Sequence, residues 1–296
     1  CISSAASDVY KRQLNGFGKG LIVGSGFLAN LSLIEALVRK GDRLFMDEEY
    51  HASGVMAAQL LGDKVIFFRH NDAEDLEKKL KQFGGRRNII AVEGVYSMSG
   101  EVCSVEIFEV ADRAGALLIV DEAHSSGVLG KNLLGVFEYY NIQIKSNHIK
   151  MGTLGKAYGS YGAYILASAE IISFLENRAK PIIYSTAPSV FDTALALVNV
   201  EHISKKSEKF RSRIAERQKL VESVIGIKSP SLIVALKYSG NSEVLDQQNR
   251  MMEEEFLVGA IRQPTVKQPI IRLIPRLGVS KKMIRKALKI MREGAK

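Results

Sequence analysis

The chain has 296 residues, of which 46% are hydrophobic and 25% are charged, and its formal net charge is +9. This composition is typical of a globular protein with room for a large core and a second lobe. No apolar run approaches the length of a membrane span, and the chain does not start with an apolar stretch, so we expect neither a membrane segment nor a secretory leader.

Cysteine content and charge distribution indicate the expected compartment and the expected kind of ligand. Cys1 and Cys103 are too few for a disulfide framework, so a reducing cytoplasm is the expected compartment. The basic clusters at 205–213 and 281–286 alternate with glutamates or apolar residues at helical spacing. This pattern favours solvated helix faces over a nucleic-acid site. A basic surface would still attract a phosphorylated cofactor, coenzyme A or an acidic carrier protein.

The first thirteen residues, from Cys1 to Gln13, show no periodicity. They resemble a translated adapter tail, so we exclude residues 1–13 from the fold prediction as a non-native tail.

From Gly18 to Asp121, short apolar strands alternate with helical patterns. We predict strands at 20–23, 42–47, 64–69, 88–93 and 116–121. We predict helices between them at 27–40, 51–61, 72–83 and 107–114. Apolar strands that alternate with helices predict an α/β fold, in which a mainly parallel sheet is covered by helices on both faces.

The second half of the chain changes character. After Gly162 we expect another strand, a helix over 169–178 and one long connecting helix from about Val190 to about Val224, which contains neither Gly nor Pro. The tail predicts a small α+β lobe with strands near 231–236, 257–262 and 270–274 and helices near 242–255 and 281–292. We therefore expect a large domain over 14–205 and a small C-terminal domain over 206–296.

The stretch over residues 148–163 holds Lys156 in a loop of small residues. Gly155, Ala157, Gly159 and Gly162 surround this lysine, so a flat ligand can approach it closely. A lysine amine in a dry site loses its proton readily, as Schiff-base chemistry requires. A lone lysine in a turn is more commonly a solvated surface residue. The rest of the chain must decide between these interpretations.

Polar residues stand where the predicted strands end. Residues 24–30 place glycines before a helix N-terminus, which suits a phosphate, although a simple tight turn is equally compatible. His51 begins the next helix, where it can cap the helix or stack on an aromatic ring. Glu93 is the last residue of another predicted strand, so its carboxylate lies at the end of that strand. Ligands of parallel sheets bind at this edge.

Asp121 is the most informative of these residues, because it ends five apolar residues and its carboxylate should be partly buried. A buried carboxylate needs a cationic or hydrogen-bonding partner, and a pyridinium nitrogen would supply one. His124 could reach another edge of the same ring. A metal site is the competing interpretation, but further Cys or His ligands are missing. Together with Lys156 and the glycine turn, the set fits pyridoxal 5′-phosphate.

The chain resembles the fold-type-I pyridoxal-phosphate enzymes and, within them, the α-oxoamine synthase family. The resemblance extends from about Leu14 to the C-terminus. The matching stretches are GSGFLAN (24–30), YHAS (50–53), FRHNDAEDLE (68–77), EGVYSMSGE (93–101), VDEAHSSGVLG (120–130), GTLGKAYGSYGA (152–163), YSTAPS (184–189) and GAIRQPTV (259–266).

The resemblance implies a role for residues in each of these stretches. Lys156 would bind the cofactor covalently and later move the α-proton of the substrate. Asp121 would pair with the pyridine nitrogen, and His51 would stack on the ring. The implied cofactor-binding set is Gly26, Phe27, His51, Glu93, Ser97, Asp121, His124, Thr153, Lys156, Ser185 and Thr186. Ser185 and Thr186 would reach the phosphate of the partner subunit, since the family active site forms between two chains of a homodimer.

The resemblance also implies the reaction and its substrates. It is closest to the family members of biotin synthesis, which condense L-alanine with a pimeloyl thioester of coenzyme A or an acyl carrier protein and release carbon dioxide. Thr265 would contact substrate, and Arg272 would bind the amino-acid carboxylate. Arg276 lies nearby, and the stretch from Thr265 to Arg272 is shorter than expected, so the choice of arginine stays open.

The start of the chain departs from the family pattern. Family members carry a further N-terminal segment with acyl-contacting residues, which this chain lacks, so we expect a truncated fragment with little activity. Glycine C-acetyltransferase, 5-aminolevulinate synthase and serine palmitoyltransferase share nearly all the motifs and remain alternatives. A catalytically silent partner subunit ranks lower because Lys156 is present, and a nucleic-acid binder ranks lowest.

Overall fold

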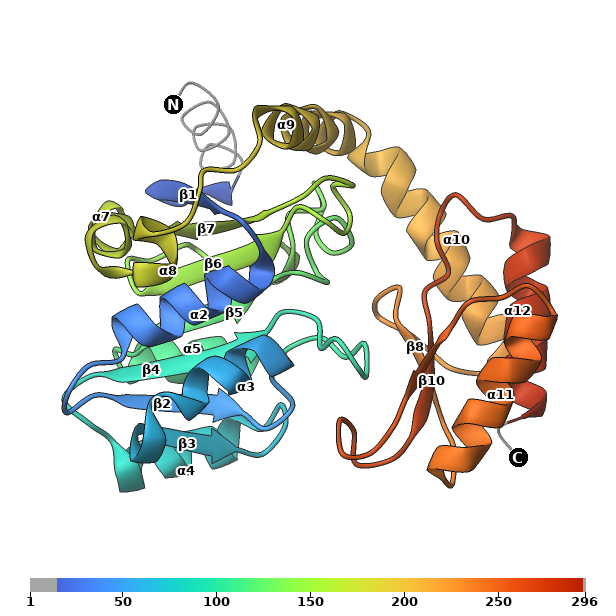
Figure 1. Ribbon diagram of the computed structural model, residues 1–296, viewed down its shortest axis with the longest axis horizontal. Coiled ribbons are helices and arrows are strands. Elements are labelled where there is room, and N and C mark those ends of the chain that lie inside the picture. The colour runs from blue at the N-terminus through green and yellow to red at the C-terminus, as the bar shows by residue number, and fades with distance from the viewer. Residues whose placement is uncertain (1–14, 295–296) are drawn as a thin grey trace. The chain divides into compact units, whose positions relative to one another are not determined.

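The computed structural model describes residues 15–294, which form two compact units (Figure 1). The first unit holds the described residues up to Tyr96 and Cys103–Ser207, and the second holds Ser97–Val102 and the chain from Glu208 onward. The tail predicted for residues 1–13 falls outside the described range. The chain therefore passes from the first unit to the second and back before it finally enters the second.

The first unit is built on a seven-stranded sheet with the order β1-β7-β6-β5-β4-β2-β3. Neighbours from β3 to β6 pair in parallel, while β7 is antiparallel to both β6 and β1. This confirms the predicted mainly parallel α/β sheet. The strands are β1 (Lys19–Val23), β2 (Arg43–Asp47), β3 (Val65–Phe68), β4 (Asn88–Glu93), β5 (Leu117–Asp121), β6 (His148–Thr153) and β7 (Ala163–Ala167).

Helices cover both faces of this sheet, because alternate residues of each buried strand point to opposite sides. On β4, Ile89 and Ala91 join the core beneath α2 (Gly26–Leu37), which crosses the sheet on the near side in Figure 1. The same layer contains α3 (Ala52–Gln59), α7 (Ala169–Arg178) and α8 (Lys180–Ile183). The other face is covered by α4 (Ala73–Phe83) and α5 (Val105–Arg113).

Local signals explain the boundaries of α2 and α4. Asp72 accepts a hydrogen bond from the Asp75 N–H at 2.8 Å and so caps α4, as its sequence pattern predicts. Ser25 caps α2 in the same way through the Leu28 N–H at 3.2 Å. Helix α2 ends at Leu37 rather than Lys40, because Val38 adopts an extended conformation.

One strand was not predicted, and one expected helix was wrong. The first six residues of the stretch from His148 form β6 in the middle of the sheet, before the loop that holds Lys156. The predicted long connecting helix is two helices, α9 (Val190–Lys205) and α10 (Ser207–Ile225), separated at Lys206. Neither Gly nor Pro marks this break. A short helix, α6 (Val136–Tyr139), also went unpredicted.

The second unit is a small α+β assembly around an antiparallel sheet of order β8-β10-β9. Its core joins apolar residues of α10, the sheet and the last two helices. The elements are β8 (Val234–Lys237), α11 (Asn241–Glu253), β9 (Gly259–Ile261), β10 (Ile270–Leu273) and α12 (Lys281–Glu293). Within residues 15–294, no helix combines the length and apolar character needed to cross a bilayer.

Candidate active site

The candidate site of the first unit lies where the parallel strands end beneath α2. Side chains two positions apart on a strand point to the same face. Glu93, Asp121 and Thr153 each follow, by two positions, a strand residue of the core beneath α2. Those core residues are Ala91, Ile119 and Met151. Glu93 and Asp121 are direct neighbours in the register of β4 and β5. Three predicted residues from distant parts of the chain therefore meet at one sheet edge.

Asp121 is buried, with 4% of its surface exposed, and hydrogen bonds hold both carboxylate oxygens. Its Oδ1 accepts the Ala123 N–H at 3.0 Å, and its Oδ2 accepts the Asn30 side-chain amide at 3.0 Å. Each oxygen keeps a second lone pair. The carboxylate can therefore accept one further N–H without giving up a bond.

His51 connects to the same group of side chains. It caps α3, since its Nδ1 accepts the Ser53 N–H at 3.2 Å, and Nδ1 also lies 2.7 Å from Ser53 Oγ. Ser53 Oγ in turn accepts the Asn30 amide at 2.9 Å. The capping interpretation of His51 is thus correct, and capping holds the ring beside the Asp121 network.

Lys156 stands in the turn that joins β6 to β7. The turn is closed by the Leu154 N–H to the Gly162 carbonyl at 2.8 Å and by Thr153 Oγ1 to the same carbonyl at 3.1 Å. The Lys156 Nζ lies 2.7 Å from His124 Nε2. Two predicted cofactor residues that are 32 positions apart in sequence are therefore in direct contact.

The N-terminus of α2 faces Thr153. A Cβ added to Gly26 would lie 4.0 Å from the Thr153 Cβ, so the first turn of the helix passes close to the end of β6. Phe27 follows with 45% of its surface exposed. A helix N-terminus with a glycine and a nearby hydroxyl is a suitable phosphate site.

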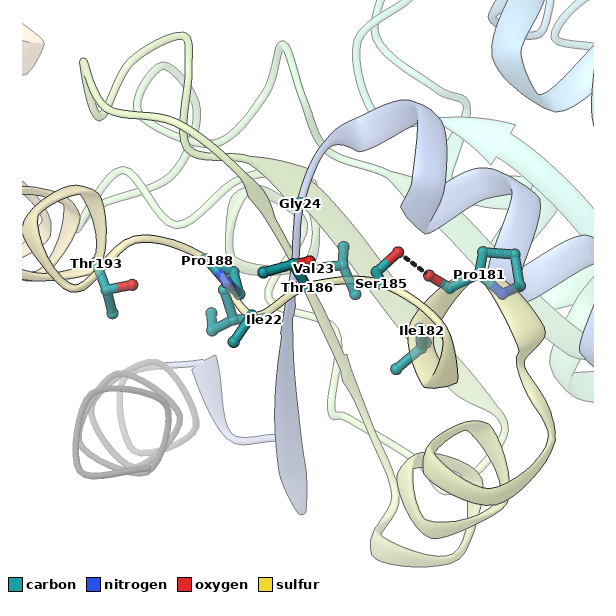
Figure 2. A pocket seen from close by; sticks show the side chains of 10 residues that line it. Ile22, Val23, Gly24, Pro181, Ile182, Ser185, Thr186, Pro188 and Thr193 are labelled. Carbon is teal, nitrogen blue, oxygen red and sulfur yellow. Dashed lines mark hydrogen bonds between the residues drawn. The ribbon is translucent and has the colours of Figure 1, made fainter.

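Ser185 and Thr186 lie near the same helix start, across a cavity of about 260 Å³. The cavity is lined by residues at the end of β1 and in the segment after α8, most of which Figure 2 labels. Its lining is Ile22, Val23, Gly24, Pro181, Ile182, Ser185, Thr186, Ala187, Pro188 and Thr193. Lys156 and Asp121 do not line it, so this cavity is separate from their cluster.

The remaining predicted residues belong to the second unit. Arg272 on β10 donates from Nε to the Ser97 carbonyl oxygen at 2.6 Å, and Ser97 is buried. Thr265 is exposed in the loop between β9 and β10. Ser97 and Arg272 are thus brought together, while Thr265 is not joined to either by a described hydrogen bond.

Sequence reasoning missed the side chains that tie the cluster together. Asn30, Ser53 and Tyr50 are all buried, and the Tyr50 hydroxyl donates to Asn30 Oδ1 at 2.7 Å. Burial, with added contributions from the negative charges of Asp121 and Glu93, raises the pKa of Tyr50 well above its usual value. An asparagine within the apolar face of a helix is a signal that could have flagged Asn30.

Known proteins resemble the chain over most of its length. The family model for class I and II aminotransferases matches residues 16–291. Two proteins from Helicobacter pylori strains, both called 8-amino-7-oxononanoate synthase, are 43% and 44% identical over 87% and 88% of this chain. The chain spans 69% and 70% of their lengths.

Solved structures agree with the fold. An 8-amino-7-oxononanoate synthase from Francisella tularensis superimposes with a TM-score of 0.85 at 26% identity, covering 98% of this chain and 86% of that one. A serine palmitoyltransferase from Sphingomonas wittichii gives a TM-score of 0.91 at 23% identity, covering 99% and 76%, which supports the fold alone. The chain therefore belongs to the class I and II aminotransferase family, has the fold of the fold-type-I pyridoxal-phosphate enzymes, and is grouped by similarity with the 8-amino-7-oxononanoate synthases.

Proposed function

We propose that the chain is a pyridoxal-phosphate-dependent acyltransferase of biotin synthesis. It condenses L-alanine with a pimeloyl thioester and forms 8-amino-7-oxononanoate, carbon dioxide and the free thiol. The observation that carries this proposal is the 43–44% identity with the two Helicobacter proteins of that name over most of the chain. The contact of Lys156 with His124 beside the buried Asp121 supports it.

The residues of the first unit fit pyridoxal 5′-phosphate. Asp121 has a lone pair available on each carboxylate oxygen for the ring N–H, and Lys156 offers an amine for the aldehyde. The α2 N-terminus, with Gly26, Phe27 and Thr153, suits the phosphate. When bound, the cofactor withdraws electrons from the amino-acid α-carbon, so that a bond there can break.

The chain's own side chains would then position and move protons. Lys156 Nζ accepts the α-proton of alanine, and His124 Nε2, 2.7 Å away, orients that amine. His51 packs on the ring face, and Glu93 lines the same edge of the sheet. For the second unit, the resemblance implies that Ser97 is a cofactor-binding residue, that Arg272 binds the alanine carboxylate through its guanidinium, and that Thr265 contacts the substrate.

The proposal includes a homodimer in the cytoplasm. Several apolar side chains between α8 and the start of α9 are exposed, with Tyr184 at 82% and Phe191 at 75%. Apolar surface of this kind favours burial against a partner. Ser185 and Thr186, which lie in this segment, would then approach the phosphate site of the other subunit.

Cofactor binding tests the proposal directly. We expect added pyridoxal phosphate to give the absorbance of a lysine-bound cofactor and borohydride to fix it covalently to Lys156. Lys156→Ala should lose the covalent product, because it removes the amine that lies 2.7 Å from His124 Nε2 in this turn. A folded wild-type protein that gives no such band would contradict the cofactor assignment.

Substrate choice is tested by thiol release. L-alanine should support release of thiol from a pimeloyl thioester, while glycine and L-serine should support much less. Faster release with glycine or serine would point to another α-oxoamine synthase. Parallel assays with the coenzyme A and carrier-protein thioesters determine the donor.

A further inference from the structure

One buried amide group joins two of the predicted cofactor residues. Asn30 Nδ2 lies 3.0 Å from Asp121 Oδ2 and 2.9 Å from Ser53 Oγ, which itself lies 2.7 Å from His51 Nδ1. Asn30 is 1% exposed, so water does not compete for these bonds. The side chain on α2 therefore connects the end of β5 with the start of α3.

Tyr50 determines which way the amide faces. Its hydroxyl donates to Asn30 Oδ1 at 2.7 Å, and in this orientation the NH₂ group points to Asp121 and Ser53. The raised pKa of Tyr50, caused chiefly by burial, keeps the phenol protonated and therefore a donor. The ring is packed tightly, since a Cβ on Gly54 would lie 2.0 Å from Tyr50 Cε1.

Ser53 links the amide to His51 through two contacts. Its Oγ, which accepts from Asn30, lies 2.7 Å from His51 Nδ1, and its N–H donates to the same ring nitrogen at 3.2 Å. The Nδ1 edge of the His51 ring is therefore held by Ser53.

We propose that Asn30 is a positioning residue for the cofactor ring: it holds the Asp121 carboxylate in the orientation that meets the ring N–H and, through Ser53, orients His51. Without Asn30, the described bonds leave the carboxylate with the Ala123 N–H alone, so it can rotate away from the ring. The inference rests on the proposed function, because it assumes that pyridoxal phosphate binds at Asp121.

The test compares pyridoxal phosphate with an analogue in which a CH group replaces the ring nitrogen. Equilibrium dialysis of the whole chain gives the dissociation constant of each ligand, and their ratio reports the bond between Asp121 and the ring N–H. We expect Asn30→Ala to lower the preference for pyridoxal phosphate about tenfold or more, as expected for a hydrogen bond to a charged group. Binding of the analogue should stay close to that of wild type.

Two further variants make the result specific. Tyr50→Phe keeps Asn30 but removes the hydrogen bond that fixes its amide, so it should lower the preference for pyridoxal phosphate by a smaller factor. If Asn30→Ala does not fold, the Tyr50→Phe result tests the positioning role. Asn147→Ala is the matched control, because Asn147 Nδ2 also donates twice, to Asp112 Oδ1 at 3.1 Å and to the Ala116 carbonyl at 2.9 Å, before the start of β6. The control should keep the full preference.

Each result separates the inference from the function on which it rests. Equal weakening of both ligands by Asn30→Ala and Tyr50→Phe would overturn the positioning role and leave a structural one. A wild-type protein that binds neither ligand would overturn the proposed function and the inference with it. Loss of preference in the two variants, with preference kept in Asn147→Ala, would support the inference.

Discussion

At the scale of single residues, Gly127 leaves no room for a side chain next to the lysine turn. Its φ is +82°, and a Cβ there would lie 2.3 Å from the Cβ of Ala157, the residue after Lys156. The glycine is needed both for its left-handed backbone and for this close approach. The position of Lys156 therefore depends on a residue outside the predicted cofactor-binding set.

We predict that Gly127→Ala lowers the free energy of unfolding by about 3 kcal/mol, because it adds backbone strain and a steric collision. It should also slow the reaction of Lys156 with pyridoxal phosphate, measured by the rise of the lysine-bound absorbance. Gly115→Ala is the matched control: Gly115 has a φ of +58° and open space around its Cβ position. An unchanged rate in Gly127→Ala would contradict this role.

At the scale of elements, Asp42 joins three segments at the edge of the sheet opposite the candidate site. It accepts the Arg39 N–H near the end of α2 at 3.0 Å and Arg87 Nη2 before β4 at 2.5 Å, and β2 begins at the next residue. Burial alone would raise the pKa of Asp42, but the hydrogen bonds from Arg87 and Arg39 outweigh it and lower the pKa.

The lowered pKa of Asp42 predicts a pH-dependent contribution to stability. The folded chain keeps this carboxylate ionised at a lower pH than the unfolded chain does, so the stabilisation is complete above pH about 4 and is lost as pH falls through the folded pKa. Asp42→Asn should cost about 1–3 kcal/mol at pH 7, and the difference from wild type should shrink in urea titrations towards pH 3. Asp63→Asn, at a carboxylate that is 92% exposed, should change little at either pH.

At the scale of the whole molecule, each of the two units has a core of its own. In the first unit apolar residues pack beneath α2 on the large sheet, and in the second they pack around the β8-β10-β9 sheet. The predicted site residues are divided between them, since Lys156 and Asp121 belong to the first unit and Ser97 and Arg272 to the second. The exposed apolar side chains between α8 and α9 belong to the first unit alone.

The proposed homodimer can be tested through this exposed segment. We expect the wild-type protein to sediment as a dimer and Phe191→Glu to shift it towards the monomer, because a buried charge without a partner opposes association. Leu60→Glu is the control, since Leu60 is 68% exposed and lies at the opposite end of α3 from the capping residue His51. A wild-type monomer at micromolar concentration, or a Phe191→Glu dimer of unchanged stability, would contradict the proposal.

Much of the fold was predictable because its signals are local. The alternation of apolar strands with capped helices up to Asp121 needs no distant contact, and β4 and α7 have the predicted bounds. Strand β6 was not predicted, because His148 and Lys150 interrupt the apolar run that marks a buried strand. The structure buries both: Lys150 Nζ donates to Asn15 Oδ1 at 2.7 Å and lies 3.8 Å from Glu122 Oε1, so distant residues compensate its charge.

The sequence by itself determined the class of the fold, the family and the lysine, aspartate and histidine expected to hold the cofactor, since these follow from local patterns and motifs. The tertiary structure alone decided which residues support them. Asn30, Tyr50 and Gly127 lie within the family motifs, but the motifs alone assign them no role. Asn30 acts through its contact with Asp121, 91 positions away, and Tyr50 through its contact with Asn30. Gly127 acts through its close approach to Ala157, 30 positions away. The effect of a buried amide, or of the Cβ that a glycine lacks, depends on the residues that surround it in space. Those residues come together only when the sheet and its helices pack.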